Sequence, residues 1–193
     1  MPGKIGVLAL QGDVREHFEL MRGLDVASVA VKTIADLETV DALVLPGGES
    51  TTIGFLLDEH AMIEPLRKRI DDGMPVLGTC AGAILLARSV LSTTSAREWP
   101  TIGVLDVVVH RNAYGRQVDS FEADVDVAGV GPMHAVFIRA PVIASVGEEV
   151  EVLATHRETP VAVRQRNVIA ATFHPELARE SGLHRLLVDA AGD

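Results

Sequence analysis

The only cysteine of the chain, Cys80, stands between two glycines in the sequence Gly78-Thr79-Cys80-Ala81-Gly82. The apolar run before this segment predicts a strand, and the run rich in Ala, Ile and Leu after it predicts a helix. A thiol at such a junction projects above the edge of a sheet, because the flanking glycines let the strand and the helix pass close to each other. The positive end of the helix dipole favours the thiolate. The pattern predicts a nucleophile; the alternative is a small buried hydrophobe, the common role of a lone cysteine.

A base for this thiol is predicted at His174, in the segment Phe173-His174-Pro175-Glu176 after the last apolar strand. The proline biases His174 toward an extended conformation, in which residues i and i+2 point to the same side. The Glu176 carboxylate can then lie beside the imidazole, fix its tautomer and stabilise the imidazolium. Because the carboxyl ends of parallel strands converge at one edge of a sheet, we expect Cys80 and His174 to meet there.

Two other interpretations of the His-Pro-Glu segment stay open. It is also typical of a helix start with an acidic residue in the first turn. His174 and Glu176 are potential metal ligands, but two ligands without a third do not make a site, and we predict no metal. The other six histidines are interpreted as surface or core residues. Predicted helices contain His17, His60 and His184, and strand or loop positions without an adjacent supporting acid of clear geometry contain His110, His134 and His156.

The first half of the chain alternates apolar runs with runs of helical periodicity. Strands are predicted at residues 4–10, 26–31, 42–45 and 75–79. Helices are predicted from Asp13, at 51–59 with Ser50 as the cap, at 63–72 closed by Gly73, and at 81–90. This alternation predicts a three-layer α/β fold of flavodoxin-like type, with a mainly parallel sheet flanked by helices.

After Ser89 the sequence changes to β-branched runs with little helical periodicity. The runs at 104–110, 117–127, 135–139, 151–155 and 160–164 predict the strands of an antiparallel extension. A last strand at 168–173 returns to the main sheet, and a C-terminal helix follows from about 177 to 190.

Composition and charge limit the class of protein. With 193 residues, 48% of them apolar, the chain can bury one full core, so we expect a single domain over residues 1–193. The formal net charge of −10 repels phosphate backbones and anionic lipids, so we expect no nucleic acid and no membrane as partner. A lone cysteine forms no internal disulfide, and neither a signal peptide nor a membrane span is evident, so a cytoplasmic location is expected.

Together these features resemble the class I, triad-type glutamine amidotransferases, whose marks are a G-x-C-x-G elbow, a His-Pro-Glu near the C-terminus and a glycine turn after an earlier strand. Further motifs narrow the resemblance to the PdxT/SNO family, the glutaminase subunits of pyridoxal 5′-phosphate synthase, over nearly the whole chain. These motifs are Leu10-Gln11-Gly12 with Arg15-Glu16-His17, Leu45-Pro46-Gly47-Gly48-Glu49-Ser50-Thr51-Thr52, Arg111-Asn112 with Gly115-Arg116-Gln117-Val118-Asp119-Ser120-Phe121, and Phe137-Ile138-Arg139-Ala140-Pro141. The stretch 92–101 is longer than the family usually carries and leaves the motifs intact.

The resemblance implies that Cys80 is the nucleophile, His174 the base and Glu176 its orienting carboxylate. It also implies a glutamine site made of Gly48, Glu49, Ser50, Arg111, Ile138 and Arg139, with Gln11 and Gly47 as additional candidates. Backbone N–H groups of Gly48 and Ala81 would form the oxyanion hole, and an arginine would bind the substrate α-carboxylate through two parallel hydrogen bonds. Taken alone, the Pro46-Gly47-Gly48 segment would be a β-turn and the two arginines solvated side chains.

The family's reaction hydrolyses L-glutamine to L-glutamate and ammonia through a cysteine thioester, without a cofactor. The resemblance implies that ammonia passes to a synthase subunit of the PdxS family, which combines it with ribose 5-phosphate and glyceraldehyde 3-phosphate to make pyridoxal 5′-phosphate. Because glycine pairs permit peptide reorientation, the oxyanion hole is predicted to form only when the synthase docks. Two alternatives stay open: a cysteine hydrolase or chaperone of related architecture, and a binding subunit without catalysis.

Overall fold

The computed structural model describes residues 3–92, 100–111 and 120–192, and its central element is a seven-stranded sheet in the order β10-β11-β12-β4-β3-β1-β2. Five neighbouring strands are parallel: β1 (Ile5–Leu8), β2 (Ser28–Val31), β3 (Ala42–Leu45), β4 (Val76–Thr79) and β12 (Val168–Ala171). β11 (Thr159–Gln165) and β10 (Glu151–His156) extend the sheet in antiparallel direction. Four of the parallel strands, β1, β3, β4 and β12, are buried along their whole length, as expected of strands covered on both faces.

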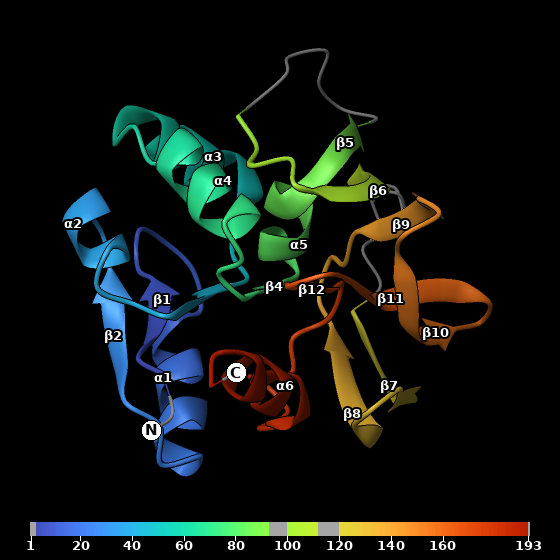
Figure 1. The fold of residues 1–193 in the computed structure, drawn as a ribbon. Helices are drawn as coiled ribbons and strands as arrows, with labels where there is room; N and C mark the ends of the chain where they lie inside the picture. The colour runs from blue at the N-terminus through green and yellow to red at the C-terminus, as the bar shows by residue number, and fades with distance from the viewer. Residues whose placement is uncertain (1–2, 93–99, 112–119, 193) are drawn as a thin grey trace.

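Helices cover both faces of this sheet (Figure 1), which confirms the predicted three-layer α/β architecture. One face carries α3 (Ser50–Glu59), α4 (Ile63–Asp71) and α5 (Ala81–Leu86), whose Leu57 and Leu66 belong to one hydrophobic core. The opposite face carries α1 (Val14–Gly23) and α6 (Gly182–Ala190), whose Met21 and Leu187 belong to a second core. A short helix, α2 (Ile34–Leu37), follows β2. None of the described helices has the length and apolarity needed to cross a membrane.

Two smaller sheets lie beside the main one. β5 (Ala87–Ser92), β6 (Leu105–Arg111) and β9 (Val142–Val146) form one of them, and β7 (Phe121–Val127) and β8 (Gly131–Phe137) form a hairpin. The predicted antiparallel extension is therefore present in the pairs β6–β9, β7–β8 and β10–β11. The pairing of β5 with β6 is parallel. β9 and α2 were not predicted, and residues 117–119 of the strand predicted at 117–127 lie outside the described residues.

Several predicted element boundaries are wrong: the strand predicted at 135–139 is β8, which begins at Gly131 and ends at Phe137, and three further differences have a local explanation. The helix predicted at 81–90 ends at Leu86, because Ala87 is extended and β5 pairs with β6, so sheet pairing overrides the helical preference of the Ala- and Leu-rich run. The C-terminal helix predicted from 177 begins at Gly182; the residues before it form turns, with Glu180 N–H donating to the Pro175 carbonyl at 2.9 Å. The cap of α3 is Glu49, one residue before the predicted Ser50.

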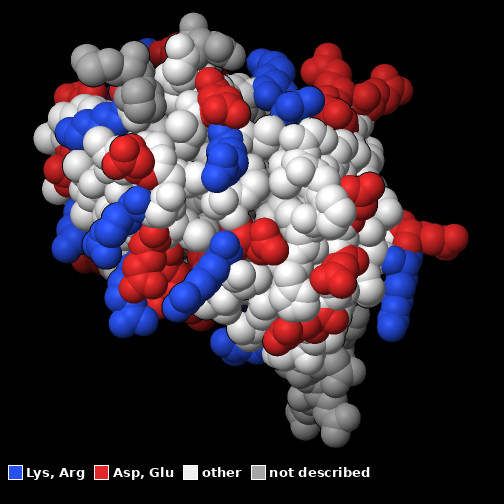
Figure 2. Space-filling model, turned by 90° about the horizontal axis from the view of Figure 1, so that it is seen from below, with Lys and Arg blue, Asp and Glu red and all other residues white. Residues whose placement is uncertain are grey.

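The face that carries α1 and α6 shows basic and acidic side chains interleaved around a broad uncharged area (Figure 2). Among the described residues of this face, no continuous basic patch is visible.

Candidate active site

Cys80 follows directly after β4 and precedes α5, with a φ of 47° and a ψ of −99°. Its backbone N–H donates to the Ala171 carbonyl at 2.8 Å, and Ala171 is the residue that pairs with Thr79 at the end of the neighbouring strand β12. The left-handed φ is a strained conformation for a residue with a side chain, and such strain is common at the turn that presents a nucleophile. Because β12 ends beside β4, the chain that follows β12 is brought to the thiol.

The two glycines around Cys80 are required by packing. A Cβ atom on Gly78 would lie 2.7 Å from the carbonyl carbon of Gly82, and a Cβ atom on Gly82 would lie 2.2 Å from the carbonyl oxygen of Leu45. The first contact crosses the turn itself, and the second joins α5 to β3. The predicted reason for the glycine frame, close passage of strand and helix, is therefore confirmed.

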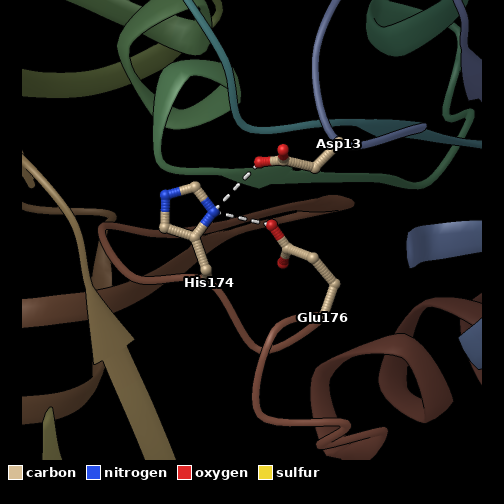
Figure 3. Close-up of side chains that lie close together, drawn as sticks. All are labelled: Asp13, His174 and Glu176. Atoms are coloured by element: carbon tan, nitrogen blue, oxygen red, sulfur yellow. Dashed lines mark hydrogen bonds and ion pairs between the residues drawn. The ribbon is translucent and has the colours of Figure 1, made fainter. Parts of the chain in front are cut away.

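His174 lies between two carboxylates (Figure 3). Its Nδ1 atom is 2.7 Å from Oε1 of Glu176 and 3.3 Å from Oδ2 of Asp13. His174 and Glu176 are buried, with exposed fractions of 5% and 3%. In Figure 3 the second ring nitrogen points away from both carboxylates, which leaves it available on the other side of the ring. The carboxylates thus hold the Nδ1 proton and set the tautomer of the imidazole.

The environment of His174 strongly favours its protonated form. Burial alone would lower the pKa of this imidazole, but hydrogen bonds with Asp13, Cys80 and Glu176 outweigh it and raise the pKa of His174 to about 12. Burial raises the pKa of the Glu176 carboxyl, against the opposing effect of its hydrogen bond with His174. A cation at His174 beside Cys80 stabilises a thiolate, so the pair suits nucleophilic chemistry.

Cys80 and His174 line a pocket of about 310 Å³. Most of the residues predicted for the glutamine site line the same pocket: Gln11, Gly48, Glu49, Ser50, Arg111, Ile138 and Arg139. The Ile138 carbonyl lies 3.9 Å from the Cys80 sulfur. The structure therefore brings together in one cavity residues that are far apart in the sequence, from Gln11 to His174.

One wall of the pocket is built on the first turn of α3. The Glu49 carboxylate accepts hydrogen bonds from the N–H groups of Thr51 and Thr52, at 3.3 and 2.7 Å, and forms an ion pair with Arg111 of β6. Burial, which would raise the pKa of Glu49, is outweighed by the hydrogen bonds from Thr52 and Thr51 and by the Arg111 charge, so this pKa is lowered. Gln11 Oε1 accepts from the Glu49 N–H at 3.0 Å. Charged groups of both signs thus face the pocket at fixed positions.

Three of the predicted residues do not line this pocket. Glu176 lies behind His174, and Ala81 is buried in the first turn of α5. Gly47 packs beneath His174, where an added Cβ atom would lie 2.4 Å from Cε1 of the ring. The Gly47 carbonyl accepts a hydrogen bond from Asp13 N–H at 3.1 Å, so the N–H of Gly48 points to the opposite side of this peptide.

The sequence reasoning missed Asp13 and did not distinguish His17 from ordinary core histidines. Asp13 follows the carboxyl end of β1, an edge where ligand-binding residues of parallel sheets gather, and this position was a usable signal. His17 stands four residues after Asp13, on the same side of α1, and is fully buried beside Glu176. A polar side chain on the buried face of a helix was the second signal, and it could have identified His17 as a functional candidate.

Asp13, His174 and Glu176 together also offer three atoms within 4.8 Å of one another as potential metal ligands, which supplies the third ligand that the sequence lacked. Both carboxylates, however, face the same nitrogen, and 2.7 Å is the length of a hydrogen bond between charged groups. A proton on Nδ1 accounts for both contacts.

A parallel sheet that ends in a cysteine elbow, next to a histidine paired with a glutamate, is the architecture of the glutamine amidotransferases. A solved structure described as a glutamine amidotransferase superposes with a TM-score of 0.91 and 49% identity, covering 98% of this chain and 99% of that one. The chain belongs to the SNO glutamine amidotransferase family, whose model matches residues 7–191.

Curated relatives lie in the same family. A protein of Thermus thermophilus described as pyridoxal 5′-phosphate synthase subunit PdxT is 52% identical over the full length of both chains. A protein of Frankia alni with the same description is 56% identical over 96% of this chain and 94% of its own.

Proposed function

We propose that this chain is the glutaminase subunit of a cytoplasmic pyridoxal 5′-phosphate synthase and hydrolyses L-glutamine to L-glutamate and ammonia. The observation that carries the proposal is that Cys80 and His174 line one pocket, with Glu176 2.7 Å from the Nδ1 atom of His174. The two relatives described as PdxT support the choice of synthase.

In the first half of the reaction, the Cys80 thiolate adds to the amide carbon of glutamine. The negative charge that develops on the amide oxygen is stabilised by the N–H groups of Ala81 and Gly48. His174, held as a cation by Asp13 and Glu176, then gives a proton to the amide nitrogen. The carbon–nitrogen bond breaks, and ammonia leaves behind a thioester on Cys80.

In the second half, water enters the site vacated by ammonia. His174, now neutral, takes a proton from the water as it attacks the thioester carbon. The carbon–sulfur bond breaks, and glutamate leaves with the thiolate and the imidazolium restored. Glu176 stays ionised throughout and stabilises each imidazolium, as the carboxylate of a triad does.

The polar groups of the pocket suit the two charges of a free amino acid. The Arg111 guanidinium provides parallel N–H donors for the α-carboxylate, and the Glu49 carboxylate attracts the α-ammonium group. Because the two are paired with each other, they contribute little net charge to this wall of the pocket. The substrate replaces one ion pair with two complementary contacts.

Ammonia must reach its acceptor before water protonates it, so the proposal includes a partner. We expect a synthase subunit of the PdxS family, which combines ammonia with ribose 5-phosphate and glyceraldehyde 3-phosphate. The Gly47–Gly48 peptide, now held by Asp13 N–H, would reorient as the synthase docks and complete the oxyanion hole.

The test is ammonia release from glutamine, measured with and without the synthase subunit. Wild type should release ammonia in the complex, and Cys80→Ala should be at least about a thousandfold slower. His60→Gln, a change at the exposed far end of α3, is the matched control and should retain full activity. Absence of glutamine turnover in the complex would favour a hydrolase of another substrate, and unchanged synthase flux in Cys80→Ala would favour a binding subunit. Full turnover without the synthase would contradict the docking-dependent oxyanion hole.

A further inference from the structure

Two fully buried histidines lie behind the candidate active site. His17 of α1 and His184 of α6 are each 0% exposed, and Nδ1 of His17 is 2.8 Å from Nε2 of His184. Their rings come from helices that are 167 residues apart in sequence and lie together under the same face of the sheet. Burial of two imidazoles is costly unless their polar atoms are paired, so the orientation of this pair matters.

The surroundings select one arrangement of protons for this pair. On its other side, His17 presents Nε2 to two oxygens: Oγ1 of Thr79 at 3.3 Å and Oε2 of Glu176 at 3.7 Å. Without a proton, Nε2 would direct its lone pair at the lone pairs of a carboxylate, which is repulsive. With a proton, Nε2–H would face an acceptor. His17 therefore carries its proton on Nε2, and its Nδ1 accepts from the Nε2–H of His184.

The same arrangement accounts for two atoms that are otherwise unpaired. Nδ1 of His184 is buried without a hydrogen-bond partner among the described residues; in this tautomer it is a bare acceptor and leaves no buried N–H unpaired. Oε2 of Glu176 is likewise buried without a hydrogen bond, and Nε2 of His17 lies 3.7 Å from it, longer than a hydrogen bond but close enough for the N–H dipole to act on the carboxylate charge. The chain of contacts then runs from His184 through His17 and Glu176 to His174.

We propose that His17, oriented by His184, is a positioning residue that keeps the Glu176 carboxylate ionised and aimed at His174. The inference rests on the proposed roles of Cys80, His174 and Glu176. Oε1 of Glu176 is satisfied by His174, whereas the second oxygen is buried and has no hydrogen bond within the described part of the chain. A neutral donor at 3.7 Å lowers the cost of the carboxylate charge without competing for the proton of His174.

His17 fits this task because it stays neutral. Burial, followed by the influence of His184 and His174, lowers the pKa of His17 well below 6.5, and burial lowers the pKa of His184 to about 4. Burial raises the pKa of the Glu176 carboxyl, and the charge of Asp13 raises it further; Glu176 also borders a hollow lined by the charged side chains of Arg15, Glu16, Glu19 and Arg179. Removal of the His17 donor adds to this effect of Asp13, so less Glu176 would be ionised at a given pH.

The test compares two substitutions of His17 that differ in one property. His17→Gln places an amide N–H near the position of Nε2, and His17→Met fills a similar volume without a donor. In the complex with the synthase, His17→Met should lower kcat for glutamine hydrolysis by up to about tenfold, because a dipole at 3.7 Å stabilises the carboxylate by less than a hydrogen bond to a charged group does. It should also move the acidic limb of the kcat/KM profile to higher pH. His17→Gln should keep most of the wild-type kcat and an acidic limb near that of wild type. His60→Gln should resemble wild type in both measurements.

A second measurement needs neither glutamine nor the synthase. Because Cys80 is the only cysteine, its alkylation by iodoacetamide can be followed as a function of pH in the isolated chain. A weaker Glu176 charge stabilises the His174 cation less and hence the thiolate less, so in His17→Met the midpoint of alkylation should move to higher pH. The midpoint of His17→Gln should stay near that of wild type.

These two measurements separate the inference from the proposed function. If wild type fails to hydrolyse glutamine but alkylation shifts in His17→Met alone, the function is wrong and the positioning role stands. Equal pH profiles and alkylation midpoints in wild type, His17→Met and His17→Gln would overturn the positioning role. Equal loss of activity in both variants, with unshifted midpoints, would also overturn it and would indicate a packing role only.

Discussion

Glu49 and Arg111, 62 residues apart in sequence, form an ion pair along the pocket that contains Cys80. Glu49 is at the same time the cap of α3, and Arg111 also donates to the hydroxyl of Thr51 in the first turn of that helix. The end of β6 and the start of α3 are thus joined by charged hydrogen bonds. This relationship places a cation and an anion at fixed positions for a zwitterionic substrate.

The first prediction concerns this arginine. Arg111→Gln should raise KM for glutamine by about ten- to a hundredfold and change kcat little, because a hydrogen-bonded charge contact is lost in ground and transition states alike. Arg111→Lys should be intermediate, since it keeps the charge and loses the parallel donors. Arg88→Gln is the matched control, because it breaks an exposed ion pair with Asp106 on the same small sheet. A fall in kcat with unchanged KM would contradict a binding role.

The second prediction concerns the two carboxylates on His174. Asp13 is 3.3 Å from Nδ1 and one-third exposed, whereas Glu176 is 2.7 Å away with a fully buried side chain. Water screens the exposed charge, so Asp13→Asn should lower kcat/KM by less than about tenfold and Glu176→Gln by at least about a hundredfold. Asp13→Asn should also move the alkaline limb of the pH profile to lower pH, because the pKa of His174 falls from about 12. Equal losses in the two variants would contradict the different roles assigned to them.

The third prediction uses the glycine beneath His174. An alanine at position 47 would place Cβ 2.4 Å from Cε1 of His174 and 2.8 Å from Oδ2 of Asp13. Since the ring must move to relieve this overlap, Gly47→Ala should reduce glutaminase activity by about a hundredfold or more while the chain stays folded. Gly23→Ala is the matched control, because its added Cβ meets nothing within 4 Å. Activity of Gly47→Ala near that of wild type would show that the ring tolerates displacement.

The fourth prediction concerns stability and pH. Burial lowers the pKa of His184 from 6.5 to about 4, so the unfolded chain binds more protons than the folded one between these values. The stabilisation is complete above pH 6.5 and is lost as pH falls toward 4. From pH 7 to pH 5, this group alone should reduce the free energy of unfolding by about 2 kcal/mol.

Urea unfolding at both pH values measures this loss. In His184→Gln the free energy of unfolding should differ less between pH 7 and pH 5, by that amount, although the variant is less stable at pH 7. His60→Gln should keep the wild-type difference. If this difference in the free energy of unfolding is the same in His184→Gln as in wild type, the loss of stability at acid pH arises from other groups.

Much of this protein can be predicted from local patterns. The alternation of buried runs with amphipathic helices predicts the parallel sheet, because strands covered on both faces must be apolar throughout. The glycines at 78 and 82 predict the elbow of Cys80, because only glycine allows the close approach seen there. The proline after His174 predicts the contact with Glu176, since i and i+2 share a side in extended chain. Each of these follows from interactions within a few residues.

The remaining features depend on contacts between distant segments. Helical preference favours a helix through residue 90, but pairing with β6 makes Ala87–Ser92 a strand. Asp13 reaches His174 because β1 and β12 end at the same edge of the sheet, and His17 becomes part of the site because α1 and α6 pack on the same face. The sequence by itself determined the type of sheet and the candidates for nucleophile and base, through local geometry. Only the tertiary structure decided which carboxylates and imidazoles surround that base, because burial and electrostatic pairing depend on segments that meet only after folding.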